Sequence, residues 1–200
     1  HTIYIVLAVL SILAIENPTQ AQKSKKNKNS QGTAEHIKRE SEYLFIEAQK
    51  YYTLEDYAKA VNLFLKCIEL VPENSAVYYK LAQIAVNNSE IDKALGYALK
   101  ALQYDDTNKY YYLITANIYT EKGDFDKAAE YYEQLVTRIA GTEEYFFELA
   151  AIYLYQERLD DALSTYQKAE EAFGVNEQTV FQKQKIYLQL NKLEEAIKNL

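Results

Sequence analysis

The chain has 200 residues, of which 48% are hydrophobic and 26% are charged, and its formal net charge is −7. It contains only five Gly and two Pro, which is too few for an all-β fold, because such a fold needs turn residues at short, regular intervals. The composition therefore predicts a helix-rich protein. The single cysteine, Cys67, excludes an internal disulfide framework and a multi-cysteine zinc site.

Residues 1–21 have the pattern of a secretory signal peptide. The run from Thr2 to Ile15 is uncharged and shorter than the roughly 20 residues that cross a bilayer, and small residues precede an expected cleavage after Ala21. We therefore expect export to the periplasm or cell envelope. The alternative is an uncleaved membrane anchor, because the chain starts at His1 without the charged leader of a signal peptide and its N-terminus is expected to be truncated.

Residues 22–40 are expected to form a flexible basic linker. The stretch from Gln22 to Gly32 has no apolar residue and carries four Lys, so it cannot bury enough surface to offset the entropy of ordering it. From Ser41 onward the chain is acidic, with 16 Lys/Arg against 26 Asp/Glu. An acidic body excludes nucleic acid as the expected partner, since contacts with phosphates supply most of that affinity.

The remaining residues, 41–200, repeat with a period of 34. Such internal similarity is the mark of stacked structural repeats. Between the two small-residue places of each repeat lies a short turn, such as Gly123-Asp124, so each repeat is expected to be two helices joined by a tight turn. The first small-residue place holds Ala48, Ala82, Ala116 and Ala150, the second holds Ala60, Ala94, Ala128, Ala162 and Ala196, and a ring follows at Tyr51, Tyr119, Tyr153 and Tyr187, with Ala85 as the exception.

This pattern resembles the tetratricopeptide repeat, in which a large residue, a Leu-small pair, an aromatic, an Ala and a second aromatic recur in order. The fourth repeat shows it most fully, with Phe146, Leu149-Ala150, Tyr153, Ala162 and Tyr166. The resemblance implies an all-α, right-handed superhelix (a solenoid) of about five helical hairpins. Their expected ranges are 41–74, 75–108, 109–142, 143–176 and an incomplete 177–200, with further repeats expected beyond Leu200.

Catalysis is not expected of this region. The chain's only histidines, His1 and His36, precede the repeats, and the glycines within the repeats are isolated, so neither histidine chemistry nor a glycine-rich phosphate loop is available there. Paired acids such as Asp160-Asp161 are expected to start helices, where negative charge is favourable. We therefore expect no catalytic residue, cofactor, metal ion or small-molecule substrate.

In tetratricopeptide arrays the first helix of each hairpin lines a concave groove that holds partner segments. Carrying this over predicts a groove lined by aromatic rings and amides, in which the family's Lys/Asn clamp for a terminal carboxylate is mostly absent, because Phe45, Gln49, Lys80 and Ile114 hold the matching places. Packing against neighbouring helices is the competing interpretation of the stripe. The predicted groove residues are Phe45, Gln49, Tyr52, Tyr79, Gln83, Asn87, Leu113, Asn117, Phe147, Tyr155 and Phe181.

The expected function is that of a non-catalytic scaffold in the bacterial cell envelope, which binds a protein or peptide segment. The alternative is that the array forms the extracytoplasmic input domain of a receptor whose output domain lies beyond Leu200. The membrane is expected to matter only through the export signal or an uncleaved anchor.

Overall fold

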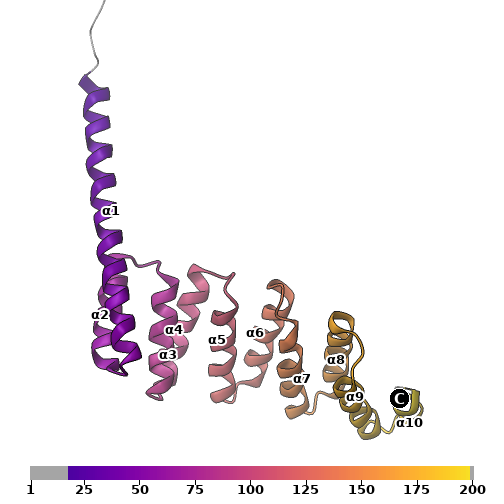
Figure 1. Cartoon of the computed structure of the whole chain (residues 1–200). Coiled ribbons are helices and arrows are strands. Elements are labelled where there is room, and N and C mark those ends of the chain that lie inside the picture. The colour runs from indigo at the N-terminus through magenta and orange to yellow at the C-terminus, as the bar shows by residue number, and fades with distance from the viewer. Residues whose placement is uncertain (1–17, 199–200) are drawn as a thin grey trace, which may run out of the picture.

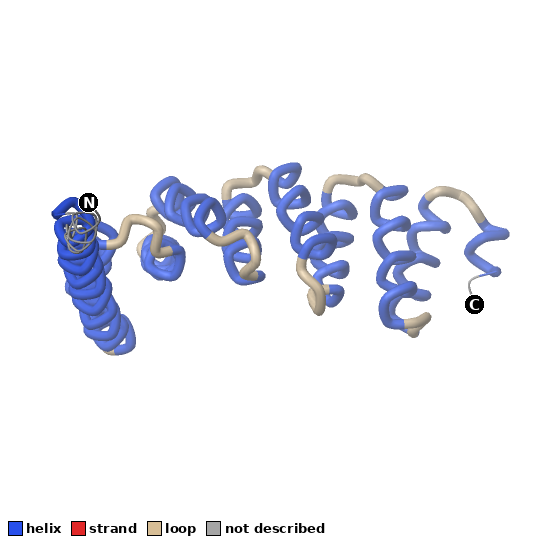
Figure 2. The backbone as a smooth tube through the Cα atoms, turned by 90° about the horizontal axis from the view of Figure 1, so that it is seen from above, coloured by secondary structure: helices blue, strands red, loops and turns tan. Residues whose placement is uncertain are grey.

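The computed structural model describes residues 18–198, and side chains from Gly32 onward. Within that range all regular structure is helical, and the helices follow one another as antiparallel hairpins along an extended array (Figure 1). The second view shows the same hairpins side by side in a single row (Figure 2). The helices are α1 (Pro18–Thr53), α2 (Tyr57–Leu70), α3 (Ser75–Asn87), α4 (Ile91–Tyr104), α5 (Lys109–Glu121), α6 (Phe125–Arg138), α7 (Phe146–Tyr155), α8 (Leu159–Phe173), α9 (Glu177–Gln189) and α10 (Leu193–Lys198), with a 3₁₀ turn at Glu143–Tyr145.

Side-chain caps explain where many of these helices begin. The side chain of Asn74 accepts a hydrogen bond from the backbone N–H of Val77 at the start of α3, and Asn176 does the same for Thr179 at the start of α9. Each bond satisfies one of the backbone donors that the first turn of a helix leaves without a partner. The side chains of Asp56, Asn108 and Asp124 cap α2, α5 and α6 in the same way.

The turn inside each hairpin repeats with the predicted period of 34. One residue in each turn has a positive φ of 57° to 76°, a conformation that costs a residue with a side chain more than it costs glycine. These residues are Glu55, Ser89, Gly123, Glu157 and Asn191. The hairpin turns therefore share one backbone geometry, although only one of them contains glycine.

Both small-residue series lie where the helices meet. All nine alanines have at most 2% of their surface exposed, as expected for sites where two helix backbones approach closely. Aromatic and aliphatic side chains fill the space beside them, including Phe64 in the first hairpin and Tyr132 in the third. The core is therefore a continuous row of small clusters between successive helices, as expected of a repeat array.

The first helix differs from the sequence prediction. Residues 22–40, expected to be a flexible linker, are helical as the upstream part of α1, which projects beyond the rest of the array (Figure 1). The composition allows this, because the stretch is rich in Lys, Gln and Glu and Pro18 stands at the first helical position, where proline is tolerated. Of residues 1–21, the predicted signal peptide, all but the last four lie outside the described residues.

Packing of α1 begins at the predicted start of the repeats. Ser41 is 2% exposed, and its hydroxyl donates to the carbonyl of Cys67 while the Cys67 thiol donates to the carbonyl of Ser41, each over 3.5 Å. From Gly32 to Glu40, by contrast, every side chain but the half-buried Ile37 is exposed. None of the helices within the described residues is both long and apolar enough to cross a membrane.

Candidate partner-binding groove

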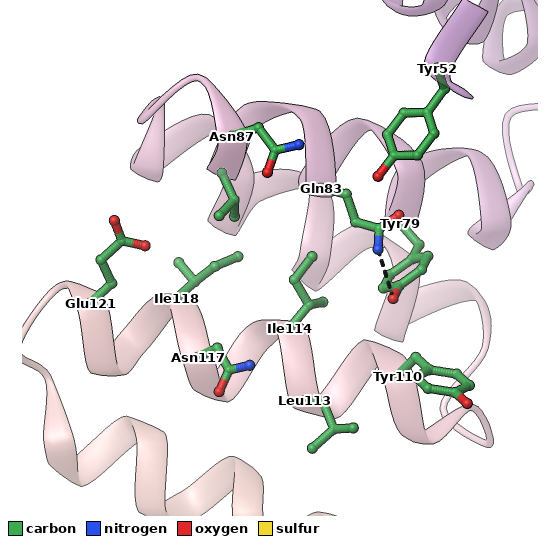
Figure 3. Close-up of a pocket in the computed structure, with 11 residues that line it drawn as sticks. Tyr52, Tyr79, Gln83, Asn87, Tyr110, Leu113, Ile114, Asn117, Ile118 and Glu121 are labelled. Carbon is green, nitrogen blue, oxygen red and sulfur yellow. Dashed lines mark hydrogen bonds between the residues drawn. The ribbon is translucent and has the colours of Figure 1, made fainter. Parts of the chain in front are cut away.

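The first helices of successive hairpins line an open pocket with a volume of about 300 Å³ (Figure 3). Side chains from α3 and α5 form its two walls, and Tyr52 reaches over it from the end of α1. Residues spaced three and four apart share one helix face, which is why Tyr79, Gln83 and Val86 all point into it from α3. The full lining is Tyr52, Tyr79, Gln83, Val86, Asn87, Tyr110, Leu113, Ile114, Asn117, Ile118 and Glu121.

A lysine lies among the aromatic rings of this pocket. The Nζ of Lys80 is 4.7 Å from the centre of the Tyr52 ring and 5.7 Å from that of Tyr79, within the range of a cation–π contact. It also donates a hydrogen bond of 3.0 Å to the side-chain oxygen of Gln83. Burial lowers the pKa of Lys80, and burial followed by neighbouring tyrosines raises the pKa of Tyr79, so both groups are partly shielded from water.

The amide side chains are already partly engaged. The Gln83 amide donates to the Tyr79 hydroxyl over 3.0 Å, as the dashed line in Figure 3 shows. Asn117 accepts from the Tyr132 hydroxyl over 2.9 Å, and Asn87 donates to the Tyr57 hydroxyl over 3.4 Å. Within the described part of the chain, the side-chain NH₂ of Asn117 and the side-chain oxygen of Asn87 form no hydrogen bond. They are therefore a free donor and a free acceptor for a partner's backbone.

Six of the eleven predicted groove residues therefore meet in one pocket. They are Tyr52, Tyr79, Gln83, Asn87, Leu113 and Asn117. Phe45 instead lines a neighbouring hollow of about 380 Å³ with Ile46 and Ala76, and its ring also packs 5.7 Å from Phe64. Gln49 is half-buried on α1, one turn before Tyr52.

The other three predicted residues lie apart from this pocket. Phe147 is half-buried and packs 6.1 Å from the ring of Tyr166, which supports the packing interpretation for it. Tyr155 is 71% exposed, with its ring 4.4 Å from Phe125. Phe181 is 53% exposed beneath the Nζ of Lys185. A separate hollow between α7 and α9 contains neither Tyr155 nor Phe181.

The sequence prediction missed several lining residues, including Tyr110 and Glu121. Tyr110 lies one turn before Leu113 and Glu121 one turn after Asn117, so helical periodicity on α5 could have identified both. Carrying over only the family's groove places omitted them. No group of three or more His, Cys, Asp or Glu among the described residues is arranged to hold a metal ion.

Comparison with known proteins decides the family. A profile of the tetratricopeptide repeat matches residues 47–110, 79–144 and 113–177, which together span more than half of the chain. The chain belongs to the tetratricopeptide repeat family. This confirms the resemblance found in the sequence and the α-solenoid fold that it implied.

Solved structures agree with this tetratricopeptide assignment. A crystal structure of MamA has 17% identity and a TM-score of 0.64, with 80% of this chain and 87% of that one covered. YrrB, described as a tetratricopeptide protein with an unusual peptide-binding site, has 17% identity and a TM-score of 0.64, covering 84% and 87%. A tetratricopeptide repeat protein from Parabacteroides merdae has 16% identity and a TM-score of 0.63, covering 80% and 77%.

These identities are too low to show more than the shared fold. No protein of established annotation is significantly similar in sequence. The family nevertheless establishes the general role of the tetratricopeptide array, which is that of a protein–protein interaction scaffold.

Proposed function

We propose that the chain is a non-catalytic scaffold that holds a partner segment in the concave pocket between α1, α3 and α5. The observation that carries this proposal is the convergence of Tyr52, Tyr79 and Tyr110 around Leu113 in one open pocket. Aromatic residues commonly supply most of the binding energy of an interface. YrrB, of similar fold, is described as having a peptide-binding site, which supports the same use of this array.

The chemistry of the pocket suits an extended or helical segment with apolar anchors. The rings and Leu113 offer apolar contact, while the donor of Asn117 and the acceptor of Asn87 can bond a backbone carbonyl and N–H. Nucleic acid is not the proposed partner, because the repeat region is strongly acidic. Nor do we propose a small-molecule substrate.

A double variant tests the pocket directly. Peptides are selected from a random library on the purified chain, and their affinities for variants are measured by calorimetry. Because Tyr52 lies over the pocket and Tyr110 lines it, Tyr52→Ala with Tyr110→Ala is expected to weaken the selected peptides by about tenfold or more. Helicity in circular dichroism is expected to stay unchanged.

The matched control removes two exposed rings outside the pocket. Tyr155→Ala with Phe181→Ala is expected to leave the affinity unchanged, although both residues belong to the stripe predicted from the sequence. Equal loss in both double variants, or loss in the control alone, contradicts the proposal.

We also propose that the protein is exported to the cell envelope, on the basis of the apolar run from Thr2 to Ile15. Residues 1–40 fused to alkaline phosphatase without its own signal are expected to give phosphatase activity outside the cytoplasm. Mass spectrometry then distinguishes cleavage after Ala21 from a retained anchor, and a fusion that stays inactive after an added start Met and Lys residues supply the missing charged leader refutes export. No feature of the described residues favours the alternative of a receptor input domain.

A further inference from the structure

A larger hollow lies on the opposite face of α3 from the concave pocket. It has a volume of about 770 Å³ and opens between α2 and α4. Its floor follows one face of α3 at Leu81, Ile84 and Ala85, which are at most 5% exposed, whereas the concave pocket uses Tyr79, Gln83 and Val86. We call this hollow the convex cleft, and it forms the outer side of the junction between the first and second hairpins.

The convex cleft coincides with a missing aromatic ring. The place of Ala85 holds tyrosine in every other repeat. In the third hairpin that tyrosine, Tyr119, stacks on Tyr131 with the ring centres 5.5 Å apart. Tyr97 is the counterpart of Tyr131 and lines the convex cleft, but the position from which a ring would reach it is occupied by the methyl group of Ala85.

The same junction lacks an ion pair that the next three junctions have, although the Asn87 amide donates to the Tyr57 hydroxyl across it. At those three junctions, an aspartate near the start of the second helix pairs with a cation at the turn of the following hairpin. The pairs are Asp92 with Lys122, Asp126 with Arg158 at 3.6 Å and Asp160 with Lys192 at 3.9 Å. The corresponding residue in the first hairpin is Ala58, which lines the convex cleft and has no charge.

The rim of the convex cleft carries three acidic residues, Glu55, Asp56 and Glu90, and one lysine, Lys93. Asp56 is paired with Lys59 at 2.6 Å, and Glu90 with Lys93 at 2.7 Å, so their charges are largely balanced within their own helices. Glu55 is exposed and forms no ion pair with any described residue. Glu55 is therefore the one acidic group of this rim left to favour a positively charged ligand group beside it.

We propose that the convex cleft binds a segment of a partner protein that inserts an aromatic side chain where the repeat tyrosine is missing and places an adjacent Lys or Arg against Glu55. The inserted ring contacts Tyr97 and the half-buried Val61 and Leu65 of α2, above the buried floor of α3, and so stacks on Tyr97 as Tyr119 stacks on Tyr131 in the following hairpin. An aromatic anchor in a well-formed pocket beside a cation is a common centre of a protein interface. This surface is separate from the concave groove, so either can fail without the other.

The test uses blocked dipeptides as probes and methyl NMR spectra of the whole chain as the readout. N-acetyl-Tyr-Arg-amide is expected to shift the methyl signals of Leu81, Ile84 and Ala85 in a saturable way at concentrations on the order of millimolar, because so small a ligand has limited affinity. N-acetyl-Tyr-Glu-amide is expected to bind several-fold more weakly, and N-acetyl-Leu-Arg-amide likewise.

Two variants make the result specific. Ala85→Tyr restores the repeat ring and is expected to abolish the shifts of Leu81 and Ile84, while the matched exposed substitution Ala172→Tyr is expected to keep them. If Ala85→Tyr does not fold, Glu55→Gln provides the test, because it is expected to remove the preference of the cleft for the Tyr-Arg dipeptide over the Tyr-Glu dipeptide.

Three outcomes overturn the proposal. One is the absence of saturable shifts at these methyl groups in the parent chain. Another is equal binding of the Tyr-Arg and Tyr-Glu dipeptides. The third is binding of p-cresol without binding of either dipeptide, which would indicate a small-molecule site. Loss of peptide binding in the concave-pocket variants affects none of these results.

Discussion

At the scale of single residues, the most unusual contact joins Lys183 of α9 to Glu170 of α8. Their charged atoms are 2.7 Å apart, and the side chains are only 7% and 11% exposed. The corresponding places at the preceding junction hold Leu149 and Val136, which belong to an apolar cluster. A buried ion pair therefore replaces a hydrophobic contact between the fourth and fifth hairpins.

Moving both charges out of water costs free energy, and this cost offsets much of the stabilisation that their attraction provides. Glu170 Oε1 is also buried without a hydrogen-bond partner in the described structure. We infer that the pair fixes how α9 docks on α8 and contributes little net stability. Removing one of the two charges should therefore lower the stability of the protein, whereas replacing both residues by an apolar pair should not.

Substitution of one or both residues tests this inference. Lys183→Leu alone is expected to destabilise the docking of α9 by about 3–5 kcal/mol, because it leaves Glu170 charged and unpaired. Lys183→Leu with Glu170→Val recreates the apolar pair and is expected to be neutral or stabilising. Urea denaturation and amide exchange of α9 measure both, and Lys168→Leu on the exposed face of α8 is the control. A double variant as unstable as the single one contradicts the inference.

Tyrosines show how far a residue's role can be derived from composition. The apolar ring and polar tip of tyrosine suit half-exposed seams, and several of the twenty tyrosines are half-buried, but Tyr132 is 6% exposed and burial raises its pKa to about 12. Its hydroxyl bonds Asn117, so a core residue orients a groove residue. That connection depends on the packing of α6 against α5 and could not be read from the sequence.

At the scale of elements, four of the five hairpin turns place a residue other than glycine in the left-handed conformation. Gly123 adopts its φ of 76° without strain, whereas Glu157 adopts 58° with a Cβ atom that crowds its backbone. The other turns hold Glu55, Ser89 and Asn191. The repeat therefore tolerates strain in its turns, and a stabilising change to glycine is available at Glu55, Ser89 and Glu157.

The turn between α7 and α8 offers the clearest test. Glu157→Gly is expected to raise the free energy of unfolding by roughly 0.5–1 kcal/mol, since the relief of left-handed strain exceeds the added entropy of the unfolded chain. Gly123→Ala is the matched opposite and is expected to lower it by about 1 kcal/mol. A Cβ atom at Gly123 meets no heavy atom within 4 Å, so backbone conformation alone causes that loss. Thermal unfolding measures both, and shifts of the same sign refute this account.

The first helix shows a limit of composition-based prediction. The lack of apolar residues before Ser41 indicated that this stretch would not join the core, and from Gly32 to Glu40 every side chain except the half-buried Ile37 is exposed. The same criterion predicted a flexible chain, whereas α1 continues upstream to Pro18. Once a helix is anchored by its packed half, each further residue extends it without a new nucleation cost.

At the scale of the whole molecule, the array presents two different surfaces. First helices form the concave pocket, and second helices bound the convex cleft. Ion pairs between successive hairpins join the outer turns from the second hairpin onward. Each exposed pair contributes at most about 1 kcal/mol, so their main effect is to set how successive hairpins align.

The sequence by itself determined the fold and its period. Alanines at fixed spacing allow helix backbones to approach, and that requirement is local enough to be seen without coordinates. It also predicted a groove on the first helices, and six of the predicted residues line one pocket there. The fold could be predicted because each repeat makes the same contacts with the next.

Only the tertiary structure decided which groove residues act together. Phe147, Tyr155 and Phe181 hold equivalent or adjacent places in later repeats, yet they lie apart from the pocket, because the neighbours of each helix differ from one repeat to the next. The convex cleft likewise depends on Ala58 and Ala85, which come from different helices and meet across one junction. The repeat pattern specifies the scaffold that all hairpins share. Residues that depart from the pattern form a site only where packing places them next to one another.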